Sequence, residues 1–304
     1  MLRYAVSGRT SVSIFAQLLV NGLIAGGTYA LAAVGYSMVY GALKFINFAH
    51  GSVAMVGAYT AFVLVAFLKL PVIVAFLAAM ALTAVLGVFV ERVAYRPLRR
   101  APKLASLTTA IAVSFVLDAS VMILMGADIR TFSLTGMSSF QLGPVFVTPV
   151  QAAIVATSLV FMVALYWLLT RTKLGKAIRA VADGVNLAEI SGINTNLVIS
   201  SVFAIGSALA AAAGALIGMD TNLQPTMGFI ITVKAFAAVV LGGLGNVWGA
   251  VVGAFVIGIA ENLGVWYIPP VWKDSIAYGI LILVLFFRPA GIFGKKEEGQ
   301  ATVL

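Results

Sequence analysis

The stretch GALKFINFAHGSVAMVGAYTAFVL, residues 41–64, interrupts a strongly apolar region with several polar or small residues. These residues are Lys44, Asn47, His50 and Gly51. Non-helical backbone at membrane depth is tolerated only where protein or a water-filled cavity surrounds it. The break is therefore either a turn between two helices or a site that contacts a polar group. The rest of the chain is needed to tell which environment surrounds it.

The composition is that of a membrane protein. The chain has 304 residues, of which 62% are hydrophobic and 10% charged, and its mean hydropathy is +1.09. Soluble domains carry about 25% charged residues. The net charge of +9 would suit nucleic acid, but membrane proteins concentrate Lys and Arg on the cytoplasmic side, which explains the excess without a polyanion. The absence of cysteine excludes disulfides and thiolate metal sites.

Apolar runs near the ~20 residues needed to cross hydrocarbon recur along almost the whole chain. They predict an all-α fold, a polytopic helical bundle of eight or nine spans that occupies residues 1–304 as a single domain. At about 1.5 Å per residue the run 229–242 covers only roughly 20 Å, so we expect a half-helix or a broken helix there. The predicted spans are 17–40, 51–69, 72–91, 104–126, 147–170, 197–219, 229–242, 246–264 and 274–291.

Basic residues gather in three places and predict the orientation. Two predicted spans separate the first cluster from the second and four separate the second from the third, so all three can lie in the cytoplasm. Nine spans would place the N-terminus outside, against the pull of Arg3 and Arg9, and the sequence leaves this end open. The clusters are Arg92, Arg96, Arg99, Arg100 and Lys103; Arg171, Lys173, Lys176 and Arg179; and Arg288, Lys295 and Lys296.

Small residues recur at helical spacing. One stripe is Gly245, Gly249 and Gly253, and a second runs over Gly206, Ala210, Gly214 and Gly218. Such stripes let helix backbones approach closely where lipid supplies no hydrophobic driving force between helices. They predict a tightly packed bundle.

No energy-converting or catalytic motif is present. The phosphate-binding pattern G-x-x-x-x-G-K-[ST] does not occur, and GGLGNVWG at 242–249 lacks the strand and acidic partner of a dinucleotide site. The single histidine rules out a histidine-rich metal site, and no paired acid and base or metal constellation indicates a membrane enzyme. Any nucleotide must therefore be handled by another subunit.

Three ionisable residues lie inside apolar runs: Asp118, Lys234 and Glu261. Each costs roughly 2.5–3.5 kcal/mol at a helix centre on insertion scales, so each should face the bundle interior, a partner subunit or an interface. A structural role and a place on a transport path both remain open for them. Ser114 and Asp118 are four residues apart and share a helix face, which suits a polar path or a hydrogen-bonded clasp.

The cytoplasmic segment RTKLGKAIRAVADGVNLAEISGINTNLVIS, residues 171–200, predicts two short helices. The first covers 177–182 and ends at Asp183-Gly184, and the second runs from about 186 to 191 and stops at Gly192. Small and apolar residues in it have no lipid to face: Ala177, Val181, Ala188, Ile190 and Ile193. Either a soluble partner buries them or the segment covers the inner end of the bundle.

Taken together, several motifs resemble the H-type permease subunit of bacterial branched-chain amino acid ABC transporters. They are NFAHG, MVGAY, ERVAYRPLRRAPKLASLTTAIAVSFVL, GKAIRAVADGVNLAEISGIN and PTMGFIITVKAFAAVVLGGLGNVWGAVVGAFVIGIAEN. The resemblance extends from about residue 18 to residue 293. It implies a multi-pass protein of the bacterial inner membrane that carries amino acids inward by alternating access.

The resemblance also implies partners. They are a second related permease, two cytoplasmic ATPase subunits that hold ATP and Mg, and a substrate-binding protein outside the membrane, whereas no cofactor is expected on this chain. The segment 171–196 is similar to the coupling helix of ABC importers, which fits a groove on the ATPase. The residues that fall on this motif are Gly175, Arg179, Ala182, Glu189 and Gly192.

One departure concerns the opening stretch. Many relatives carry glutamate after AHG, whereas Ser52 stands there in this chain, so importers of urea or short amides, which use similar permeases, stay open as an alternative. A self-sufficient secondary transporter, with intramembrane charges that carry coupling ions, is a rival from another class. The candidate residues of a translocation path are Asn47, His50, Ser52, Ser114 and Asp118.

Overall fold

The computed structural model describes residues 8–99, 101–132 and 139–294, with side chains from residue 12 onward. The predicted polytopic α-helical fold is confirmed. Within the described residues, seven helices are long and apolar enough to cross a membrane. They are α1 (Gly8–Leu43), α3 (Val72–Val90), α4 (Lys103–Met125), α5 (Pro149–Arg171), α8 (Thr195–Asp220), α10 (Val247–Gly264) and α11 (Lys273–Phe287), the last counted together with the 3₁₀ turn Pro270–Trp272 that precedes it. Two shorter apolar helices, α2 (His50–Ala66) and α9 (Met227–Gly242), bring the apolar helices to the nine predicted positions.

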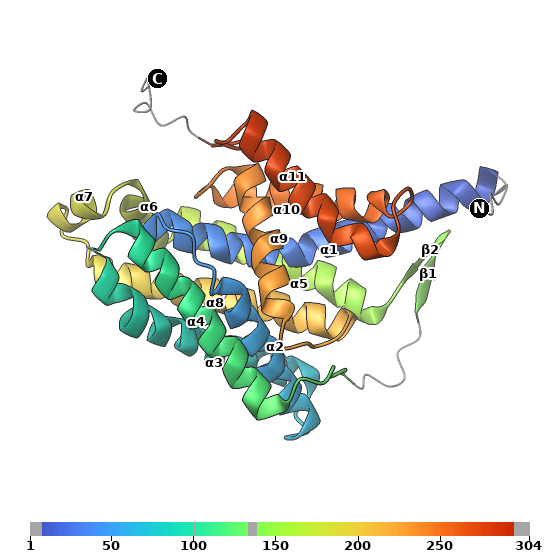
Figure 1. Ribbon diagram of the computed structural model, residues 1–304, viewed down its shortest axis with the longest axis horizontal. Coiled ribbons are helices and arrows are strands. Elements are labelled where there is room, and N and C mark those ends of the chain that lie inside the picture. Colours follow the sequence, from blue (N-terminus) through green and yellow to red (C-terminus); the bar gives the residue numbers. More distant parts are fainter. Residues whose placement is uncertain (1–7, 100, 133–138, 295–304) are drawn as a thin grey trace.

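The two ends of the bundle are built differently. Two short helices, α6 (Lys173–Asp183) and α7 (Val185–Ile190), lie at the end opposite to the first turns of α1 (Figure 1). The basic clusters predict that α6 and α7 lie in the cytoplasm, so we call this end of the bundle the inner end and the end where α1 begins the outer end. Arg3, Arg100, Lys295 and Lys296, which the orientation argument also used, lie outside the described residues.

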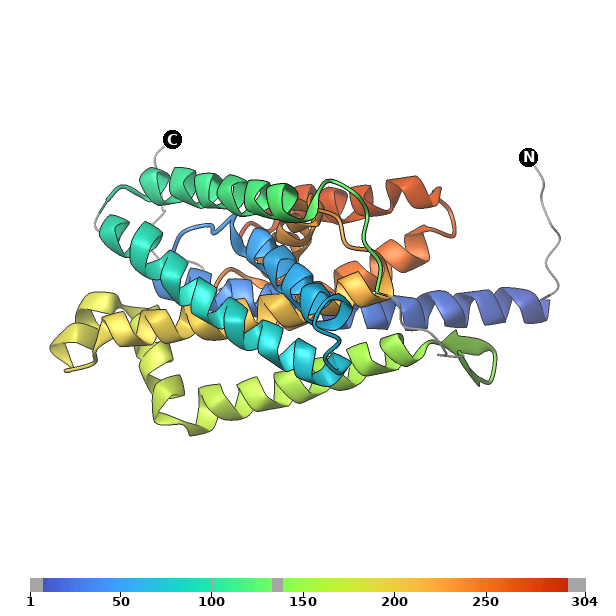
Figure 2. The ribbon, with the colours of Figure 1, turned by 90° about the horizontal axis from the view of Figure 1, so that it is seen from below.

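The centre of the bundle is formed by α1, α2 and α8. The span in α8 is the most buried, at 72%, whereas that in α4 is 11% buried and that in α11 only 6%. Figure 2 shows α4 and α5 on opposite sides of the molecule, with α1 and α2 between them. With 36 residues α1 is about 54 Å long, so it extends beyond the hydrocarbon layer.

Glycine and alanine set the closest helix crossings. A Cβ atom on Gly57 would lie 2.6 Å from the Ala211 Cα, so α2 and α8 meet there without room for a larger side chain. Gly22 and Gly258 bring α1 and α10 together in the same way. The predicted stripe on α10 is partly wrong, because Gly245 lies in the turn before the helix with a φ of +81°, which glycine adopts readily.

Helices α2 and α9 begin beside each other inside the bundle. With 17 and 16 residues they span about 24–26 Å, less than the ~30 Å of hydrocarbon. The Gly51 backbone N–H donates a 2.9 Å hydrogen bond to the Thr232 hydroxyl, and a Cβ on Gly228 would lie 2.9 Å from the Ser52 Cα. The predicted short span at 229–242 is thus confirmed, and α2 is a second short helix.

The outer end carries a small antiparallel hairpin that the sequence reading did not predict. Strands β1 (Phe140–Leu142) and β2 (Val145–Val147) pair through a turn in which Gly143 has a φ of +61°. The Gln17 side chain binds the Phe146 backbone twice, at 2.8 and 3.0 Å, and so ties the hairpin to α1. At the inner end α3 continues through a π-helical turn, Glu91–Tyr95, and a 3₁₀ turn, Arg96–Leu98.

Candidate functional site

The polar break between α1 and α2 is mostly a buried turn. Lys44 starts it in the left-handed region with a φ of 55°, and the chain then runs back into the bundle to begin α2 at His50. The Asn47 amide oxygen accepts hydrogen bonds from the Tyr95 hydroxyl at 2.8 Å and from the Ala49 backbone at 3.2 Å. These bonds replace the helical hydrogen bonds that the break removes.

His50 is also held within the protein. Its Nε2 lies 3.0 Å from the Ala32 carbonyl oxygen, so Nε2 carries the proton and donates. The Tyr36 ring packs edge-on against the imidazole, with ring centroids 5.5 Å apart. Asn47 and His50 are 5% and 2% exposed, and neither lines a cavity described below. Both residues fix the position from which α2 starts.

Ser52, Ser114 and Asp118 come together in one cavity. This α2–α4 cavity has a volume of about 430 Å³ and lies between the start of α2, the middle of α4 and the start of α9. The Asp118 carboxylate interacts with the Ser52 hydroxyl, although 66 residues separate them in the chain. The lining residues are Phe48, Ser52, Ile111, Ser114, Phe115, Asp118 and Phe229.

The polar atoms of the α2–α4 cavity are not all satisfied. The Ser114 hydroxyl donates to the Ile111 carbonyl at 2.7 Å, within its own helix. The Asp118 Oδ1 atom is buried and has no hydrogen-bond partner among the described residues. Since an unpaired buried carboxylate oxygen is costly, this atom can accept a bond from a ligand or a partner chain. Aromatic rings and Ile111 form the rest of the wall.

A second cavity lies in the outer half of the bundle, where Lys234 forms the centre of a charge cluster. The Lys234 Nζ atom lies 2.8 Å from the Tyr29 hydroxyl, 3.1 Å from Glu261 Oε2 and 2.7 Å from Asp274 Oδ1. Helices α1, α9, α10 and α11 meet through these bonds. The prediction that Lys234 and Glu261 face the bundle interior is confirmed, because they are 7% and 0% exposed.

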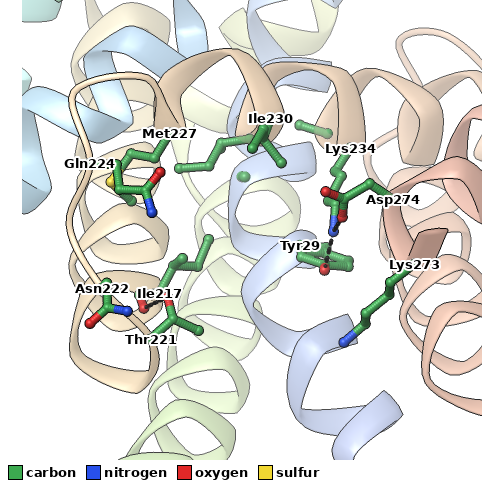
Figure 3. A pocket seen from close by; sticks show the side chains of 13 residues that line it. Tyr29, Ile217, Thr221, Asn222, Gln224, Met227, Ile230, Lys234, Lys273 and Asp274 are labelled. Atoms are coloured by element: carbon green, nitrogen blue, oxygen red, sulfur yellow. Dashed lines mark hydrogen bonds and ion pairs between the residues drawn. The ribbon is translucent and has the colours of Figure 1, made fainter. Parts of the chain in front are cut away.

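This α9–α11 cavity has a volume of about 340 Å³. Lys234, Lys273 and Asp274 lie on one side of it, and Thr221 and Asn222 lie across from them (Figure 3). The sequence reading did not single out Lys273 and Asp274, because they stand at the edge of the last apolar run, where charges are common.

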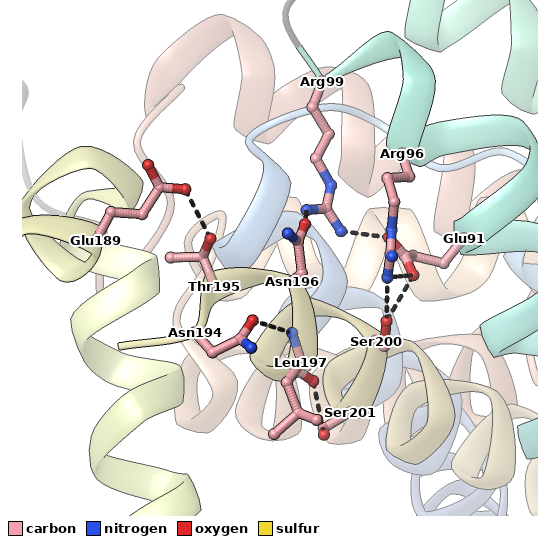
Figure 4. A network of polar contacts seen from close by, with 10 residues as sticks. All are labelled: Glu91, Arg96, Arg99, Glu189, Asn194, Thr195, Asn196, Leu197, Ser200 and Ser201. Carbon is pink, nitrogen blue, oxygen red and sulfur yellow. Dashed lines mark hydrogen bonds and ion pairs between the residues drawn. The ribbon is translucent and has the colours of Figure 1, made fainter. Parts of the chain in front are cut away.

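The inner end of the bundle holds a second charge cluster. Glu91 is fully buried, and its carboxylate binds Arg96 at 3.1 Å and also binds Arg99. The Ser200 hydroxyl donates to Glu91 Oε2 at 2.7 Å, and Arg99 donates to the Asn196 amide oxygen at 2.6 Å (Figure 4). Burial lowers the pKa of the Arg99 guanidinium and Glu91 opposes that effect, so the group stays charged. The cluster joins the end of α3 to the start of α8.

Helices α6 and α7 have one packed face and one free face. Helix α6 ends at Asp183 and α7 ends two residues before Gly192, whose φ is +79°, so the predicted C-terminal ends are confirmed. Helix α6 begins at Lys173 after the Thr172 cap, four residues before the predicted start at 177. Val181 and Ala188 are 1% and 2% exposed, so of the two alternatives for these residues the structure supports the second: they cover the inner end of the bundle.

The free apolar surface of α7 consists instead of Leu187, 69% exposed, and Ile190, 85% exposed. Ala177 and Ile193 are half-buried. The reading that the segment covers the inner end of the bundle is therefore confirmed for one face, and the other face presents two large aliphatic side chains away from the bundle.

The five residues carried over from the coupling motif have different surroundings. Gly175 is buried where α6 turns back on α5, since a Cβ there would lie 2.6 Å from the Leu169 Cα. The Arg179 guanidinium donates to the Leu169 carbonyl. Ala182 is half-buried, and Glu189 accepts a 2.7 Å bond from the Thr195 hydroxyl. These bonds brace the segment, and Gly192 supplies its final turn.

Within the described residues, no group of three or more His, Asp or Glu side chains could hold a metal ion. The arrangement instead offers two polar cavities in an apolar bundle and a braced helix pair at one end. Such an arrangement suits passage of a small solute and transmission of movement, and it contains no reacting constellation.

The chain matches the family model described as branched-chain amino acid transport system / permease component over residues 18–285. It is 40% identical over 297 residues to the high-affinity branched-chain amino acid transport system permease protein BraD of Pseudomonas aeruginosa, covering 93% of this chain and 97% of that protein. It is 39% identical to LivH of Escherichia coli K12, which carries the same description, with 93% and 96% covered. The ribose import permease protein RbsC of Haemophilus influenzae is 29% identical over 260 residues, with 83% and 76% covered.

Proposed function

The chain belongs to the family of permease components of branched-chain amino acid transport systems, and on that premise we propose how its structure carries out import. It acts as the membrane-spanning subunit of an ATP-binding-cassette importer of the bacterial inner membrane. Leucine, isoleucine and valine are the expected solutes, following the descriptions of the BraD and LivH relatives. The chain itself hydrolyses no nucleotide in this proposal.

The subunits expected around it are a second related permease, two cytoplasmic ATPases that hold ATP and Mg, and an extracytoplasmic substrate-binding protein. The observation that carries this part is the two-sided α7 surface. Leu187 and Ile190 project from a helix whose other face is anchored on the bundle. A short, braced helix suits the transmission of ATPase closure because movement of the partner must then shift α8 and cannot be absorbed by a flexible loop.

Coupling residues follow from the same geometry. Arg179 and Gly175 hold α6 against the end of α5, and Glu189 holds α7 against the start of α8 through Thr195. We propose that the segment 171–196 acts as the coupling loop, with Ala182 in the last turn of α6 and Gly192 in the turn that follows α7. Arg179→Ala should then lower substrate-stimulated ATP hydrolysis more than it lowers docking of the binding protein.

The α2–α4 cavity is our candidate for part of the translocation path. Ser52 and Asp118 supply polar contacts, Ser114 lies beside them, and Phe48 and Phe229 supply apolar wall. Asp118→Asn should lower the rate of leucine uptake at unchanged expression, because the carboxylate is the only full charge among the lining residues of this cavity. Asn47 and His50 contribute by fixing the start of α2 and need not contact the solute.

The decisive experiment is transport by purified, reconstituted subunits. Proteoliposomes with both permeases and both ATPases should take up leucine when binding protein is outside and ATP inside. Liposomes that contain this chain alone, under a proton or sodium gradient, should show no uptake. Uptake by the chain alone would favour a secondary transporter and would overturn the proposal.

A crosslinking experiment tests the docking surface separately. The chain has no cysteine, so Ile190→Cys and Glu189→Cys each introduce a single thiol on α7. Either thiol should crosslink to an ATPase subunit in an assembly that still transports. Val271→Cys, 90% exposed at the opposite end of the bundle, is the matched control and should not crosslink. The absence of any crosslink along α6 and α7 would contradict the coupling assignment.

A further inference from the structure

The α9–α11 cavity has a feature that the α2–α4 cavity lacks: charged groups of both signs line it. Lys234, Lys273 and Asp274 are among its lining residues, whereas Asp118 is the single charged residue that lines the α2–α4 cavity. A free amino acid is a zwitterion, so a site that holds it needs donors for the carboxylate and an acceptor for the ammonium group. Of these two cavities, the α9–α11 cavity is the one whose lining offers both.

Lys273 has unused bonding capacity. A lysine ammonium group has three N–H donors, and the Lys273 Nζ atom donates one of them to the Asn262 amide oxygen at 3.1 Å. Figure 3 shows its side chain extending toward the cavity rather than toward Lys234. Lys234 differs, because its contacts to Tyr29, Glu261 and Asp274 use all of its donors. Lys273 is therefore the cation of this cavity that can bind a carboxylate.

Asp274 has capacity for a second cation. Its Oδ1 atom binds Lys234 at 2.7 Å, but its side chain is 44% exposed, so solvent or a ligand can reach the carboxylate. Glu261 is less suitable because it is fully buried and does not line the cavity. The two charged groups that can serve a ligand thus stand next to each other at the start of α11.

The remaining wall suits an aliphatic side chain. Ile217, Met227, Ile230 and Ile231 line the cavity from α8 and α9, with Thr221 and Asn222 at its rim. A volume of about 340 Å³ falls within the usual ~300–1,000 Å³ range of small-molecule sites. The cavity lies near the end of α8 and the start of α11, which is the outer end of the bundle, where a solute would arrive.

We propose that the α9–α11 cavity is an entry site for a branched-chain amino acid in zwitterionic form. Lys273 receives the α-carboxylate, Asp274 receives the α-ammonium group and the apolar wall receives the side chain. The proposal rests on the proposed import function. It places this site within this subunit alone, on the other side of the start of α9 from the α2–α4 cavity.

The first test measures binding to the complete permease and ATPase assembly in lipid nanodiscs, without binding protein or nucleotide. Competition against radiolabelled L-leucine should rank leucine at least tenfold above 4-methylpentanoate, which lacks the ammonium group, and above 3-methylbutylamine, which lacks the carboxylate. Lys273→Gln should lower leucine affinity at least tenfold and leave 3-methylbutylamine binding unchanged. Asp274→Asn should instead leave 4-methylpentanoate binding unchanged.

The matched control for charge is Lys69→Gln, an exposed lysine in the loop between α2 and α3 at the same end of the bundle. The assembly that carries Lys69→Gln should bind all three compounds with the same affinities as the unaltered assembly. Equal losses for all three compounds in Lys273→Gln, or no loss, would overturn the assignment of the carboxylate to Lys273.

A second test does not depend on affinity for the analogues. Asn222→Cys places one thiol at the cavity rim in a chain that has no cysteine. Leucine should slow its reaction with a maleimide at least threefold, and Lys273→Gln in the same background should abolish that protection. If leucine gives no protection while the assembly still imports leucine with ATP, the entry site is refuted and the import function stands. If the assembly fails to import with ATP, the import function itself is refuted.

Discussion

The two buried charge clusters of this chain have similar components but opposite designs. At the inner end one carboxylate, Glu91, lies among two arginines and a serine, and both of its oxygens are bonded. In the outer half one ammonium group, Lys234, lies between two carboxylates, and Glu261 Oε1 has no partner among the described residues. In the inner cluster the free atom is on a cation, because the buried Arg99 Nε has no partner among the described residues, whereas in the outer cluster it is on a carboxylate.

The difference follows from access to water. Arg96 and Arg99 have side chains 36% and 18% exposed, so their charges are partly solvated whatever happens to Glu91. The side chains of Lys234 and Glu261 are 9% and 0% exposed, so water solvates neither charge and each is stabilised by its bonded partners. The inner cluster therefore holds α3 and α8 together whatever the state of the rest of the molecule. At the outer cluster, a bound ligand or a movement of α11 would change the free energy of the buried ion pairs substantially.

The largest effect should come from breaking the outer cluster at its centre. Lys234→Met leaves Glu261 without its cation in a fully buried position, and loss of one partner of a buried pair costs about 3–5 kcal/mol. Unfolding of the purified chain in mixed micelles, followed by tryptophan fluorescence, should show that loss. Stability equal to that of the unaltered chain would contradict the comparison.

A second substitution sharpens this prediction. In the double variant Lys234→Met and Glu261→Gln, the buried position 261 is neutral and its amide oxygen still accepts from the Tyr29 hydroxyl. Most of the lost stability should return, because an apolar and amide replacement of a buried ion pair is often close to neutral. The two effects should be strongly non-additive, with a coupling of about 2 kcal/mol or more. Simple addition would show that the two charges are stabilised separately.

An intermediate effect is expected at the inner cluster. Glu91→Gln keeps the size of the side chain but weakens its bonds to Arg96 and Arg99, and hydrogen bonds to charged groups contribute about 1.5–3 kcal/mol each before solvation of the freed groups. Because both arginines reach water, we expect a net loss of about 1–2 kcal/mol, in the range of typical point substitutions. The same unfolding assay measures it, and a loss larger than that of Lys234→Met would reverse the order proposed here.

Most features formed by residues close together in the chain were predictable from the sequence, and features formed by packing between distant segments were not. The nine apolar runs, the short helix at 229–242 and the stop at Gly192 are local patterns, and all three are confirmed. Ser114 and Asp118 were placed on one face by helical spacing alone, but their meeting with Ser52 depends on how α2 packs against α4. The β-hairpin at 140–147 was missed because its strands have only three residues each.

The charge clusters show the limit most clearly. Glu91 ends the predicted span 72–91 just before a basic cluster, and nothing in ERVAYRPLRR indicates that the helix continues as a π turn and buries this carboxylate. For Val181 and Ala188 the sequence left open whether a partner or the bundle buries them, and the fold places them on the bundle. The sequence does not show which apolar residues of this short segment pack on the bundle and which stay exposed. Only the folded structure shows that Leu187 and Ile190 are exposed.

The smallest effect on stability, with the clearest effect on function, is expected on α7. Ile190→Ser removes an 85% exposed side chain that contacts little of the bundle, so the free energy of unfolding should change by no more than about 0.5 kcal/mol. Substrate-stimulated ATP hydrolysis by the reconstituted assembly should nevertheless fall severalfold, because an apolar anchor in a docking groove is lost. Val271→Ser, an equally exposed aliphatic position at the outer end, is the control and should leave hydrolysis unchanged. If both variants hydrolyse ATP like the unaltered assembly, the free face of α7 does not dock the ATPase. The structural difference between the inner and outer ends would then have no consequence for ATP-driven transport.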